Sequence, residues 1–343
     1  MREVNIAGGT GNSRILIGES LDNVTRYLPD IPAVIITDET VSGLYGKRFP
    51  NFPVITIGMG EGAKTLDTVA AIYRRLLELS MDRTGFVLAI GGGLVCDVAG
   101  FAASTFLRGI RFGFVSTTLL SQVDASVGGK NGINFHGLKN MVGVFRQPEF
   151  VVCDTALLPT LPERELLSGL GEVVKHAAIA DTALFAFLET HAAETLSLSS
   201  PVMERLVTDS VLIKSRVVET DELEAGARRL LNFGHTFGHP LELLTGAAHG
   251  QAVAAGMVMA ARISVEEGLL SIPEAERLTR LIETLGLPVR LDADPAQVIA
   301  ALEKDKKRAG EAVHFVLLEA IGKAVVRPLA LSKIRSFAGR MKA

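Results

Sequence analysis

The stretch "FVLAIGGGLVCDVAG", from Phe86 to Gly100, decides the fold class of this chain of 343 residues. An apolar run ends in three consecutive glycines, and a second apolar run of helical character follows at once. A continuous apolar run is typical of a parallel strand covered on both faces, and glycines at its end let a helix begin close to a phosphate. The stretch therefore predicts a strand–turn–helix unit that binds a dinucleotide, with a tight turn that binds nothing as the alternative.

Similar apolar runs recur through the first half of the chain, with helical patterns such as 64–79 between them. The further predicted strands cover 33–37, 54–58, 111–118 and 150–154. After about residue 157 the pattern becomes mostly helical, with one late strand or hairpin at 313–318. Alternating strands and helices indicate a doubly wound sheet. We therefore predict an N-terminal Rossmann-like α/β domain over 1–157 and a mainly α-helical C-terminal domain over 158–343.

Composition excludes several classes of protein. The formal net charge of −3 argues against a nucleic-acid partner, because nucleic-acid-binding domains usually carry a basic excess. The two cysteines, Cys96 and Cys153, lie in apolar runs and are expected to be buried thiols. The first residues show no signal peptide, and the longest apolar stretch, 252–261, is too short to cross a membrane. We expect a soluble, cytoplasmic protein.

Two further features support a dinucleotide site in the first half. Asp38 ends the strand "AVIITD", where a carboxylate can accept hydrogen bonds from ribose hydroxyls. The stretch "GMGEGAK" forms a second glycine turn after a strand and carries Glu61 and Lys64. Two glycine turns and an acidic strand end suit a dinucleotide better than a single phosphate.

The stretch "SQVDASVGGKNGINFHGLKN", 121–140, is dense in polar and cationic residues. Lys130, Lys139 and Asn140 follow two glycines, and Asp124 precedes them. One interpretation is a solvated polar loop. The other is an anion site for a phosphorylated substrate, with Arg108 of "FLRG" as a further ligand.

Three of the seven histidines fall within "LNFGHTFGHPLELLTGAAHGQAV", 231–253. His235 and His239 have the i, i+4 spacing of a chelating pair on a helix. Pro240 argues against that pair, because a proline deep in a helix is unfavourable and the helix is expected to start only shortly before it. His235 would then lie at or before the first turn, and not one full turn below His239 on a continuous helix. Spacing also allows His235 to converge with His249, and it does not decide between the two.

A second cluster occurs in "GEVVKHAAI", where Glu172, Lys175 and His176 share one helical face. An i, i+4 pair of Glu172 and His176 can chelate a metal, but most such pairs are surface contacts. The isolated histidines are interpreted as structural; they are His136, His191 and His314.

Taken together, these residues resemble the 3-dehydroquinate synthases, the NAD- and divalent-metal-dependent cyclases of the shikimate pathway. The resemblance is carried by "GMGEGAK", "AIGGGLVCDVAGFAASTFLRG", "VSTTLLSQVDASVGGKNGIN", "DTALLPTLP", "GLGEVVKH", "LNFGHTFGH", "HGQAVAAGM" and "DKKRAG". It implies a homodimeric lyase that converts 3-deoxy-D-arabino-heptulosonate 7-phosphate (DAHP) to 3-dehydroquinate and phosphate. The steps implied are transient oxidation by NAD, phosphate elimination, re-reduction and intramolecular aldol closure. The implied cofactors are NAD and one divalent metal, zinc or cobalt.

The resemblance also implies roles for individual residues. The metal ligands would be Glu172, His235 and His249. The NAD contacts would be Asp38, Glu61, Lys64, Gly93, Asp97, Thr117, Thr118, Lys130, Lys139 and Thr160. The catalytic residues would be His239, Glu224, Lys175, Asn232 and Asp124. The substrate would be bound by Arg108, Lys130, Asn140, Lys214, Arg228 and Lys306, with Arg108 reaching into the neighbouring subunit's site and Lys306 preferred over Lys307.

The chain departs from the family pattern at a few points. "NFHGLKN" stands where the family usually reads close to "NHPLGKN", "HGQAV" replaces "HGEAV", and Pro240 stands where a small residue is common. The nearest rival functions are those of sibling cyclases that make deoxy-inososes or valiolones. A metal-dependent alcohol dehydrogenase and a non-catalytic dinucleotide-binding module are more distant alternatives.

Overall fold

The structure is a computed structural model that describes residues 1–306 and 312–340, with the side chains of 303–306, 312 and 338–340 outside the description. The chain forms two compact units, which are treated separately below. Unit 1 comprises Met1–Leu161 and Met203–Leu223, and unit 2 comprises Pro162–Val202 and Glu224–Ala343. The predicted break near residue 157 did not include the return of 203–223 to unit 1.

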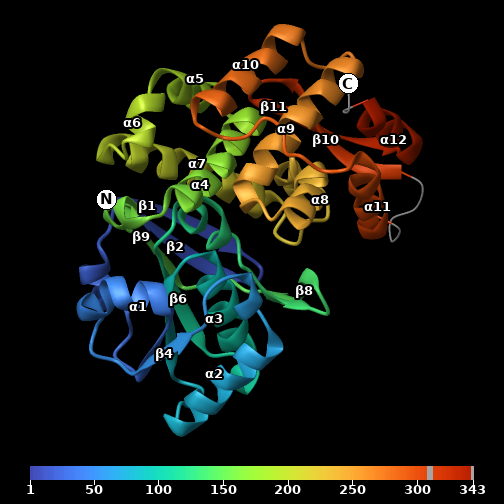
Figure 1. Cartoon of the computed structure of the whole chain (residues 1–343). Helices are drawn as coiled ribbons and strands as arrows, with labels where there is room; N and C mark the ends of the chain where they lie inside the picture. The colour runs from blue at the N-terminus through green and yellow to red at the C-terminus, as the bar shows by residue number, and fades with distance from the viewer. Residues whose placement is uncertain (307–311, 341–343) are drawn as a thin grey trace. The chain divides into compact units, whose positions relative to one another are not determined.

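Unit 1 is built on a seven-stranded sheet (Figure 1). Its strands, in spatial order, are β1 (Arg2–Gly8), β2 (Gly11–Ile17), β9 (Phe150–Cys153), β6 (Arg111–Ser116), β5 (Phe86–Gly91), β3 (Ala33–Asp38) and β4 (Val54–Ile57). All neighbouring pairs are parallel except β1 with β2. The five strands predicted from apolar runs are therefore confirmed, and the predicted helix at 64–79 is present as α2 (Leu66–Glu78).

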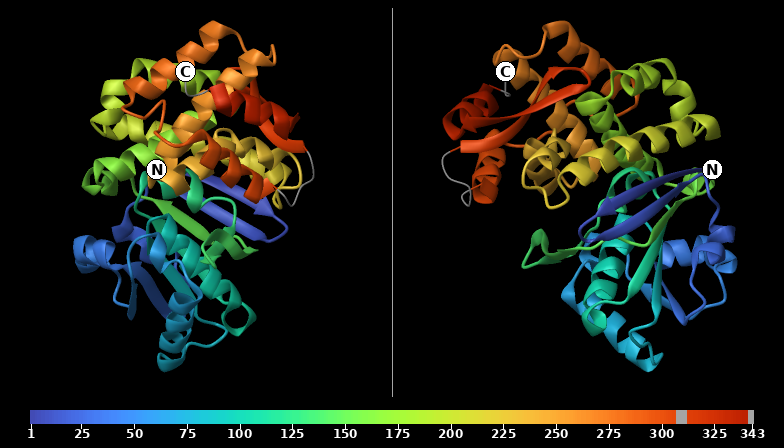
Figure 2. Two further views of the ribbon diagram at one scale, coloured as in Figure 1. Left: turned by 45° about the vertical axis from the view of Figure 1, so that its right-hand side comes forward. Right: turned by 180° about the vertical axis from the view of Figure 1, so that it is seen from behind.

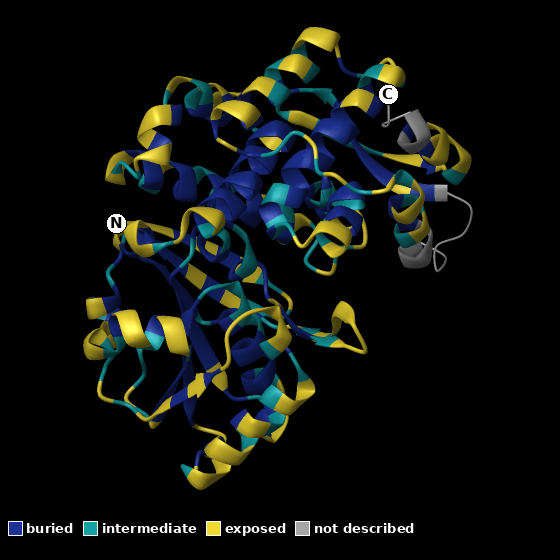
Figure 3. Ribbon diagram, viewed as in Figure 1, coloured by how far each residue is buried: buried dark blue, intermediate teal, exposed yellow. Residues whose placement is uncertain are grey.

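Helices cover both faces of this sheet. Helix α1 (Glu39–Tyr45) packs on one face, where Ile35 and Leu88 join a cluster of buried apolar side chains with Tyr45. Helix α3 (Gly93–Thr105), with α2 beside it, lies on the other face (Figure 1). Every residue of β5 is buried, which is why this strand reads as an unbroken apolar run (Figure 3).

Two hairpins in unit 1 were not predicted. The first is formed by β1 and β2, and the second by β7 (Lys130–Phe135) and β8 (Leu138–Phe145) (Figure 2). The second hairpin occupies part of the stretch for which a solvated polar loop and an anion site were the two interpretations. Its strands contain glycine, asparagine and lysine, which are poor strand formers, so composition gave no strand signal.

Unit 2 is mainly helical, as predicted. Its helices are α4 (Glu163–Ala180), α5 (Thr182–Thr190), α6 (Ala192–Leu196), α8 (His235–Thr245), α9 (His249–Glu266), α10 (Ile272–Thr284), α11 (Pro295–Lys306) and α12 (Leu331–Arg340). Helix α7 (Ser200–Thr220) begins in unit 2 and continues into unit 1. Side-chain caps fix two starts: Asp181 accepts hydrogen bonds at the start of α5, and Ser271 accepts one at the start of α10.

Helices α4 and α9 approach each other closely in unit 2, and both are buried there (Figure 3). A Cβ atom added to Gly171 would lie 2.3 Å from the carbonyl oxygen of Gly250, and one added to Gly250 would lie 1.9 Å from that of Ser168. Real Cβ atoms do not come so close to backbone. Only glycine therefore permits this crossing.

The late strand predicted at 313–318 is confirmed as part of a hairpin of β10 (Ala312–Ala320) and β11 (Lys323–Ala330) (Figure 2). This hairpin is fixed to α9, because the backbone N–H of Leu318 donates to the hydroxyl of Ser264 at 3.0 Å. Among the described residues, no helix is at once long and apolar enough to cross a membrane.

The end of α7 is tied to the turn of the β1–β2 hairpin within unit 1. The carboxylate of Glu222 accepts hydrogen bonds from the hydroxyl of Thr10 at 2.5 Å, from the backbone N–H of Thr10 at 3.2 Å and from the amide of Gln147 at 3.0 Å. Burial opposes ionisation of this carboxyl, but these hydrogen bonds outweigh it and hold the pKa of Glu222 below its ordinary value.

We expect Glu222→Ala to lower the free energy of unfolding by about 1–3 kcal/mol, because it leaves the buried amide of Gln147 without its acceptor. Urea unfolding at neutral pH measures this change. Glu219→Ala, three residues earlier at the end of α7, is the matched control, since Glu219 accepts one long hydrogen bond, from Ala7 at 3.4 Å. Because folding lowers the pKa of Glu222, its contribution is present above the unfolded-state pKa and is lost as pH falls through the folded-state pKa. Equal losses in both variants would contradict this assignment.

Candidate functional site

The carboxyl ends of the parallel strands in unit 1 carry the predicted dinucleotide residues. The strand order reverses between β5 and β3, and ligands of doubly wound sheets bind at such a switch point. Asp38 ends β3, and its carboxylate accepts a hydrogen bond from the backbone N–H of Val41 at 2.8 Å. Gly93 opens α3 directly after β5, so the backbone N–H groups of this helix start face the same edge. These two positions flank the switch point.

Lys64 is at the centre of a hydrogen-bonded group in unit 1. It is 5% exposed, and its ammonium donates to Asp97 at 2.5 Å and to the side chain of Asn140 at 2.6 Å. Burial raises the pKa of Asp97, and the charge of Lys64 opposes that rise. Glu61 accepts from the amide of Asn134 at 2.7 Å. The structure thus joins three predicted cofactor residues to one predicted phosphate ligand.

Asp124 and Lys214 also meet within unit 1. Lys214 of α7 donates to the backbone oxygen of Asp124 at 2.5 Å and forms an ion pair with its carboxylate. Lys214 is 6% exposed, so this cation is held in place by the segment 121–125. The return of 203–223 to unit 1 is what brings the two residues together.

The remaining predicted residues of unit 1 lie at strand or turn ends. Thr117 and Thr118 follow β6, and Thr118 exchanges hydrogen bonds with Ser121. Thr160 shares a hydrogen bond with Tyr45 at 2.5 Å. Lys130 starts β7, and Lys139 lies on β8; both are exposed.

Arg108 lies in the turn after α3. It and the preceding Leu107 both have positive φ, of 68° and 49°. Two such residues in succession are strained for side chains with a Cβ, and such strain often occurs at functional sites.

A carboxylate and two imidazoles converge in unit 2. Glu172 on α4 is fully buried, and its Oε1 lies 3.7 Å from Nε2 of His235 and 3.6 Å from Nε2 of His249. These three side chains form the only group of this kind found within unit 2 among the described residues. His235 is the first residue of α8, and His249 is the first residue of α9.

The two imidazoles are oriented by their other nitrogen. Nδ1 of His235 lies 3.2 Å from the backbone oxygen of Phe233, and Nδ1 of His249 lies 3.1 Å from the carboxylate of Glu242. If each Nδ1–H donates to its oxygen, Nε2 presents a lone pair toward Glu172. Sequence reasoning assigned no role to Glu242, because its partner His249 lies beyond a helix end and no local spacing marks the pair.

This donor set fits a divalent metal. Ligands of a tetrahedral zinc ion lie at about 2.0–2.2 Å from the metal, which places them about 3.4 Å apart. The separations of 3.6 and 3.7 Å need only a small adjustment to meet that geometry. Burial and the charge of Lys175 hold the pKa of His235 well below its ordinary value, which favours the neutral, ligating form. Burial opposes the charged form of His249 as well, but hydrogen bonds to Glu172 and Glu242 raise its pKa to about 9.

The expectation about Pro240 is only partly correct. Helix α8 begins at His235, so this histidine lies in the first turn as expected. The helix nevertheless continues through Pro240 to Thr245, so His235 and His239 do lie one turn apart on a continuous helix. Their ring centroids are 5.2 Å apart. The expected separation was wrong because a helix starting at His235 has few hydrogen bonds for a proline at its sixth position to interrupt.

The other predicted residues of unit 2 lie on α4, on the segment before α8 or at the end of α11. Lys175 is 1% exposed and forms an ion pair with Oε2 of Glu172. Asn232 donates to the carboxylate of Glu224 at 2.7 Å. Arg228 is 1% exposed, and a guanidinium is almost never so buried unless it is paired. Helix α11 ends at Lys306, whose side chain lies outside the described residues, as does all of Lys307.

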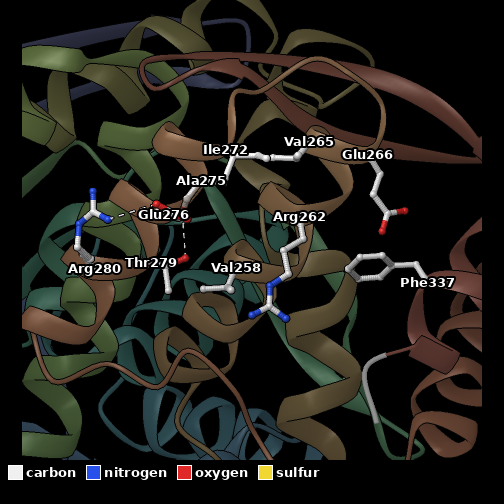
Figure 4. A pocket seen from close by; sticks show the side chains of 10 residues that line it. All are labelled: Val258, Arg262, Val265, Glu266, Ile272, Ala275, Glu276, Thr279, Arg280 and Phe337. Atoms are coloured by element: carbon white, nitrogen blue, oxygen red, sulfur yellow. Dashed lines mark hydrogen bonds and ion pairs between the residues drawn. The ribbon is translucent and has the colours of Figure 1, made fainter. Parts of the chain in front are cut away.

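Helices α9, α10 and α12 line an open depression elsewhere in unit 2 (Figure 4). Its lining includes Val258, Ile272 and Phe337, with Arg262 and Glu276 among its charged residues. It shares no residue with the group of Glu172, His235 and His249. The chemistry is therefore assigned to that group.

A parallel, dinucleotide-type sheet followed by a helical unit is a fold that solved sugar-phosphate cyclases and dehydrogenases also have. The solved structure of a 2-deoxy-scyllo-inosose synthase, with carbaglucose-6-phosphate, NAD+ and Co2+, is similar at a TM-score of 0.88 and 27% identity, covering 98% of this chain and 99% of its own. A 2-epi-5-epi-valiolone synthase from Streptomyces hygroscopicus subsp. jinggangensis, with NAD+ and Zn2+ bound, is similar at a TM-score of 0.88 and 27% identity. The match covers 100% of this chain and 98% of that one. A probable glycerol dehydrogenase from Sinorhizobium meliloti, at a TM-score of 0.69 and 17% identity, shares the fold.

Within this class, family models narrow the assignment. The model described as 3-dehydroquinate synthase N-terminal matches residues 54–168, and the model described as 3-dehydroquinate synthase C-terminal matches residues 169–308. A 3-dehydroquinate synthase from Halorhodospira halophila is 47% identical over 86% of this chain and 85% of the relative, and one from Geobacter sp. (strain M21) is 46% identical over 84% and 83%. The chain belongs to the 3-dehydroquinate synthase family.

We expect His235→Ala and His249→Ala each to abolish stoichiometric metal binding, whereas His239→Ala retains it. The first two remove a donor that faces Glu172, and His239 is not part of that group. Metal content after dialysis, measured by elemental analysis, tests this expectation. Loss of metal from His239→Ala to the same extent would show that His239 is a ligand.

We expect Gly171→Ala to reduce metal affinity by at least about tenfold, because a methyl group at the α4–α9 crossing forces Glu172 and His249 apart. Titration of the metal-free protein with Zn2+ measures the affinity. Gly43→Ala is the matched control, since a Cβ there on α1 meets nothing within 4 Å. Unchanged affinity in Gly171→Ala would show that the crossing does not set the spacing of the ligands.

Proposed function

We propose that the chain converts DAHP to 3-dehydroquinate and phosphate, as a carbon–oxygen lyase that reduces and then restores NAD within each turnover. The observation that supports this proposal most strongly is the convergence of Glu172, His235 and His249 in a chain that is 46–47% identical to 3-dehydroquinate synthases. Identity to the inosose and valiolone synthases is 27%, which favours DAHP over the substrates of those cyclases. We further propose a cytoplasmic homodimer, in which Arg108 reaches the neighbouring subunit's site.

The metal proposed at Glu172, His235 and His249 is zinc or cobalt. Cyclases of similar structure hold Co2+ or Zn2+ together with NAD+. When bound, such a cation lowers the pKa of substrate hydroxyls, and NAD supplies a reversible hydride acceptor. Lys175 is paired with the other oxygen of Glu172 and orients that carboxylate.

Proton transfer is assigned to exposed or paired groups near the ligands in unit 2. His239 is exposed on α8, and its ring lies 5.2 Å from that of His235 and 6.1 Å from that of His249. An imidazole there can accept the proton of a substrate hydroxyl near neutral pH. Glu224 and Asn232, held to each other at 2.7 Å, support this transfer and orient the substrate.

The substrate's two anionic groups are assigned to different cations. Arg228 and Lys214, both largely buried, are proposed to bind the carboxylate, Arg228 through two hydrogen bonds. Lys130, Asn140, Lys306 and Arg108 are proposed to bind the phosphate. Asp124 fixes Lys214, and is proposed to contact the substrate as well. The NAD contacts are proposed at Asp38, Glu61, Lys64, Gly93, Asp97, Thr117, Thr118, Lys130, Lys139 and Thr160.

We expect the metal-loaded protein to release phosphate from DAHP in the presence of substoichiometric NAD, with formation of 3-dehydroquinate and without net NADH. Phosphate release and absorbance at the wavelengths of dehydroquinate and NADH follow the reaction. Accumulation of NADH in proportion to product would indicate a dehydrogenase. Turnover of a heptulose or hexose phosphate lacking the carboxylate, but not of DAHP, would indicate a sibling cyclase.

We expect His239→Ala to reduce kcat by about 10²–10⁴-fold while NAD binding and metal content stay within about twofold, because it removes a general base and no ligand. Single-turnover kinetics and equilibrium NAD titration separate these effects. A rise in KM at unchanged kcat would assign His239 to substrate binding instead.

A further inference from the structure

Asn134 lies at an irregularity of the β7–β8 hairpin that the proposed function leaves without a role. The pairing register shifts between Ile133 and Phe135, where Asn134 on β7 faces three residues of β8, which are Lys139, Asn140 and Met141. Its backbone N–H donates to the backbone oxygen of Lys64 at 2.8 Å. The bulge therefore lies on β8 and includes Asn140, and Asn134 is the β7 residue opposite it.

The side chain of Asn134 joins the turn at 61–64 to the bulged part of β8, and these two segments are far apart in sequence. Its amide donates to the carboxylate of Glu61 at 2.7 Å. Its side-chain oxygen accepts from the backbone N–H of Asn140 at 2.9 Å. Asn140 has a φ of 53°, a conformation that asparagine adopts more readily than most residues. The amide nitrogen of Asn134 therefore binds the turn at 61–64, and its amide oxygen binds β8.

Lys64 closes this arrangement into a ring. Its backbone oxygen accepts from Asn134, while its ammonium donates to the side chain of Asn140 at 2.6 Å. The turn that carries Glu61 and Lys64 therefore cannot shift without moving Asn140. A ring of hydrogen bonds that includes a buried ammonium is stiffer than its separate bonds.

We infer that Asn134 is a positioning residue that couples the dinucleotide-binding turn at 61–64 to the phosphate-binding residues Lys139 and Asn140 of β8. The inference rests on the proposed function, which assigns Glu61 and Lys64 to NAD and Asn140 to the substrate phosphate. Binding of NAD to the first turn fixes Asn134, and Asn134 holds Asn140 in its left-handed conformation for the phosphate. Coupling of this kind is reciprocal, so phosphate tightens NAD binding to the same degree.

Asn134→Asp separates the two halves of the link. The carboxylate still accepts from the backbone N–H of Asn140, but it has no donor for Glu61 and repels it. We expect the Kd for NAD to rise about tenfold, the size of effect that a lost hydrogen bond to a charged group produces. We also expect saturating inorganic phosphate to tighten NAD binding by about threefold or more in the unaltered chain and by less than about 1.5-fold in Asn134→Asp.

A double variant reverses donor and acceptor across the same contact. In Asn134→Asp combined with Glu61→Gln, the new amide donates to the new carboxylate, so the hydrogen bond returns with opposite polarity. We expect the Kd for NAD of the double variant to lie within about twofold of that of Glu61→Gln alone, so that the two changes are strongly non-additive. A purely structural role for Asn134 gives additive effects, which would overturn the inference.

The controls separate this link from folding and from the metal. His136→Asn changes the exposed tip of the same hairpin and keeps a residue suited to its φ of 48°. It should leave the Kd for NAD and its response to phosphate unchanged. Metal content and the thermal midpoint should be the same in Asn134→Asp as in the unaltered chain.

The outcomes that contradict the inference are distinct from failure of the proposed function. The coupling through Asn134 alone is overturned if the unaltered chain binds NAD and phosphate does not change that affinity. It is also overturned if Asn134→Asp leaves the Kd for NAD and its response to phosphate within about twofold of the unaltered chain. If the unaltered chain binds no NAD, the proposed function is overturned and this inference with it.

Discussion

Helices α4 and α9 cross in direct backbone contact at two glycines, and the chemistry of unit 2 depends on this constraint. Gly171 and Gly250 bring two backbones to a distance that no Cβ permits. Glu172 follows Gly171 on one helix and His249 precedes Gly250 on the other, so backbone contact and ligand contact are set by neighbouring residues. A fully buried carboxylate is costly unless charges or a metal compensate it. Lys175 provides part of that compensation, and a metal held by Glu172 and the two imidazoles would provide the rest.

Unit 1 uses a different means to position its residues. The parallel sheet brings strand ends to one edge, but the side chains that follow are held by hydrogen bonds between turns. Lys64 links Asp97 to Asn140, and Lys214 is fixed by Asp124. In both cases a lysine of low exposure joins segments distant in sequence. Cations placed in this way lose little conformational entropy when an anion binds, which favours binding of phosphorylated or carboxylated ligands.

Sequence patterns predicted the buried elements well because burial leaves a strong periodic signal. The five apolar strands and the helical second half are present in the structure. The β7–β8 hairpin was missed, since its register depends on a bulge in β8 opposite Asn134 and on contacts with Lys64 from another turn. Tertiary hydrogen bonds of this kind leave no local pattern.

For the candidate site, spacing alone left the partners of His235 open. Glu172 lies on another helix, and its proximity follows from a helix crossing that one sequence does not reveal. The resemblance to the 3-dehydroquinate synthases named these residues, and the structure shows that three of them converge. The same limitation hid Glu242, whose role comes from the orientation of His249 rather than from a motif.

The path of α7 has a consequence for how this chain can exchange parts with its relatives. The two family models meet between residues 168 and 169, inside α4, while α7 carries the chain back to unit 1 further on. A hybrid gene joined at that border would therefore combine a sheet from one parent with the α7 of the other. Its β1–β2 turn would meet a foreign residue in place of Glu222, and its Asp124 a foreign residue in place of Lys214. Successful exchange of the two units within this family should then require three crossovers, one at that border and one on each side of 203–223, so that the helix is inherited together with the sheet it packs on.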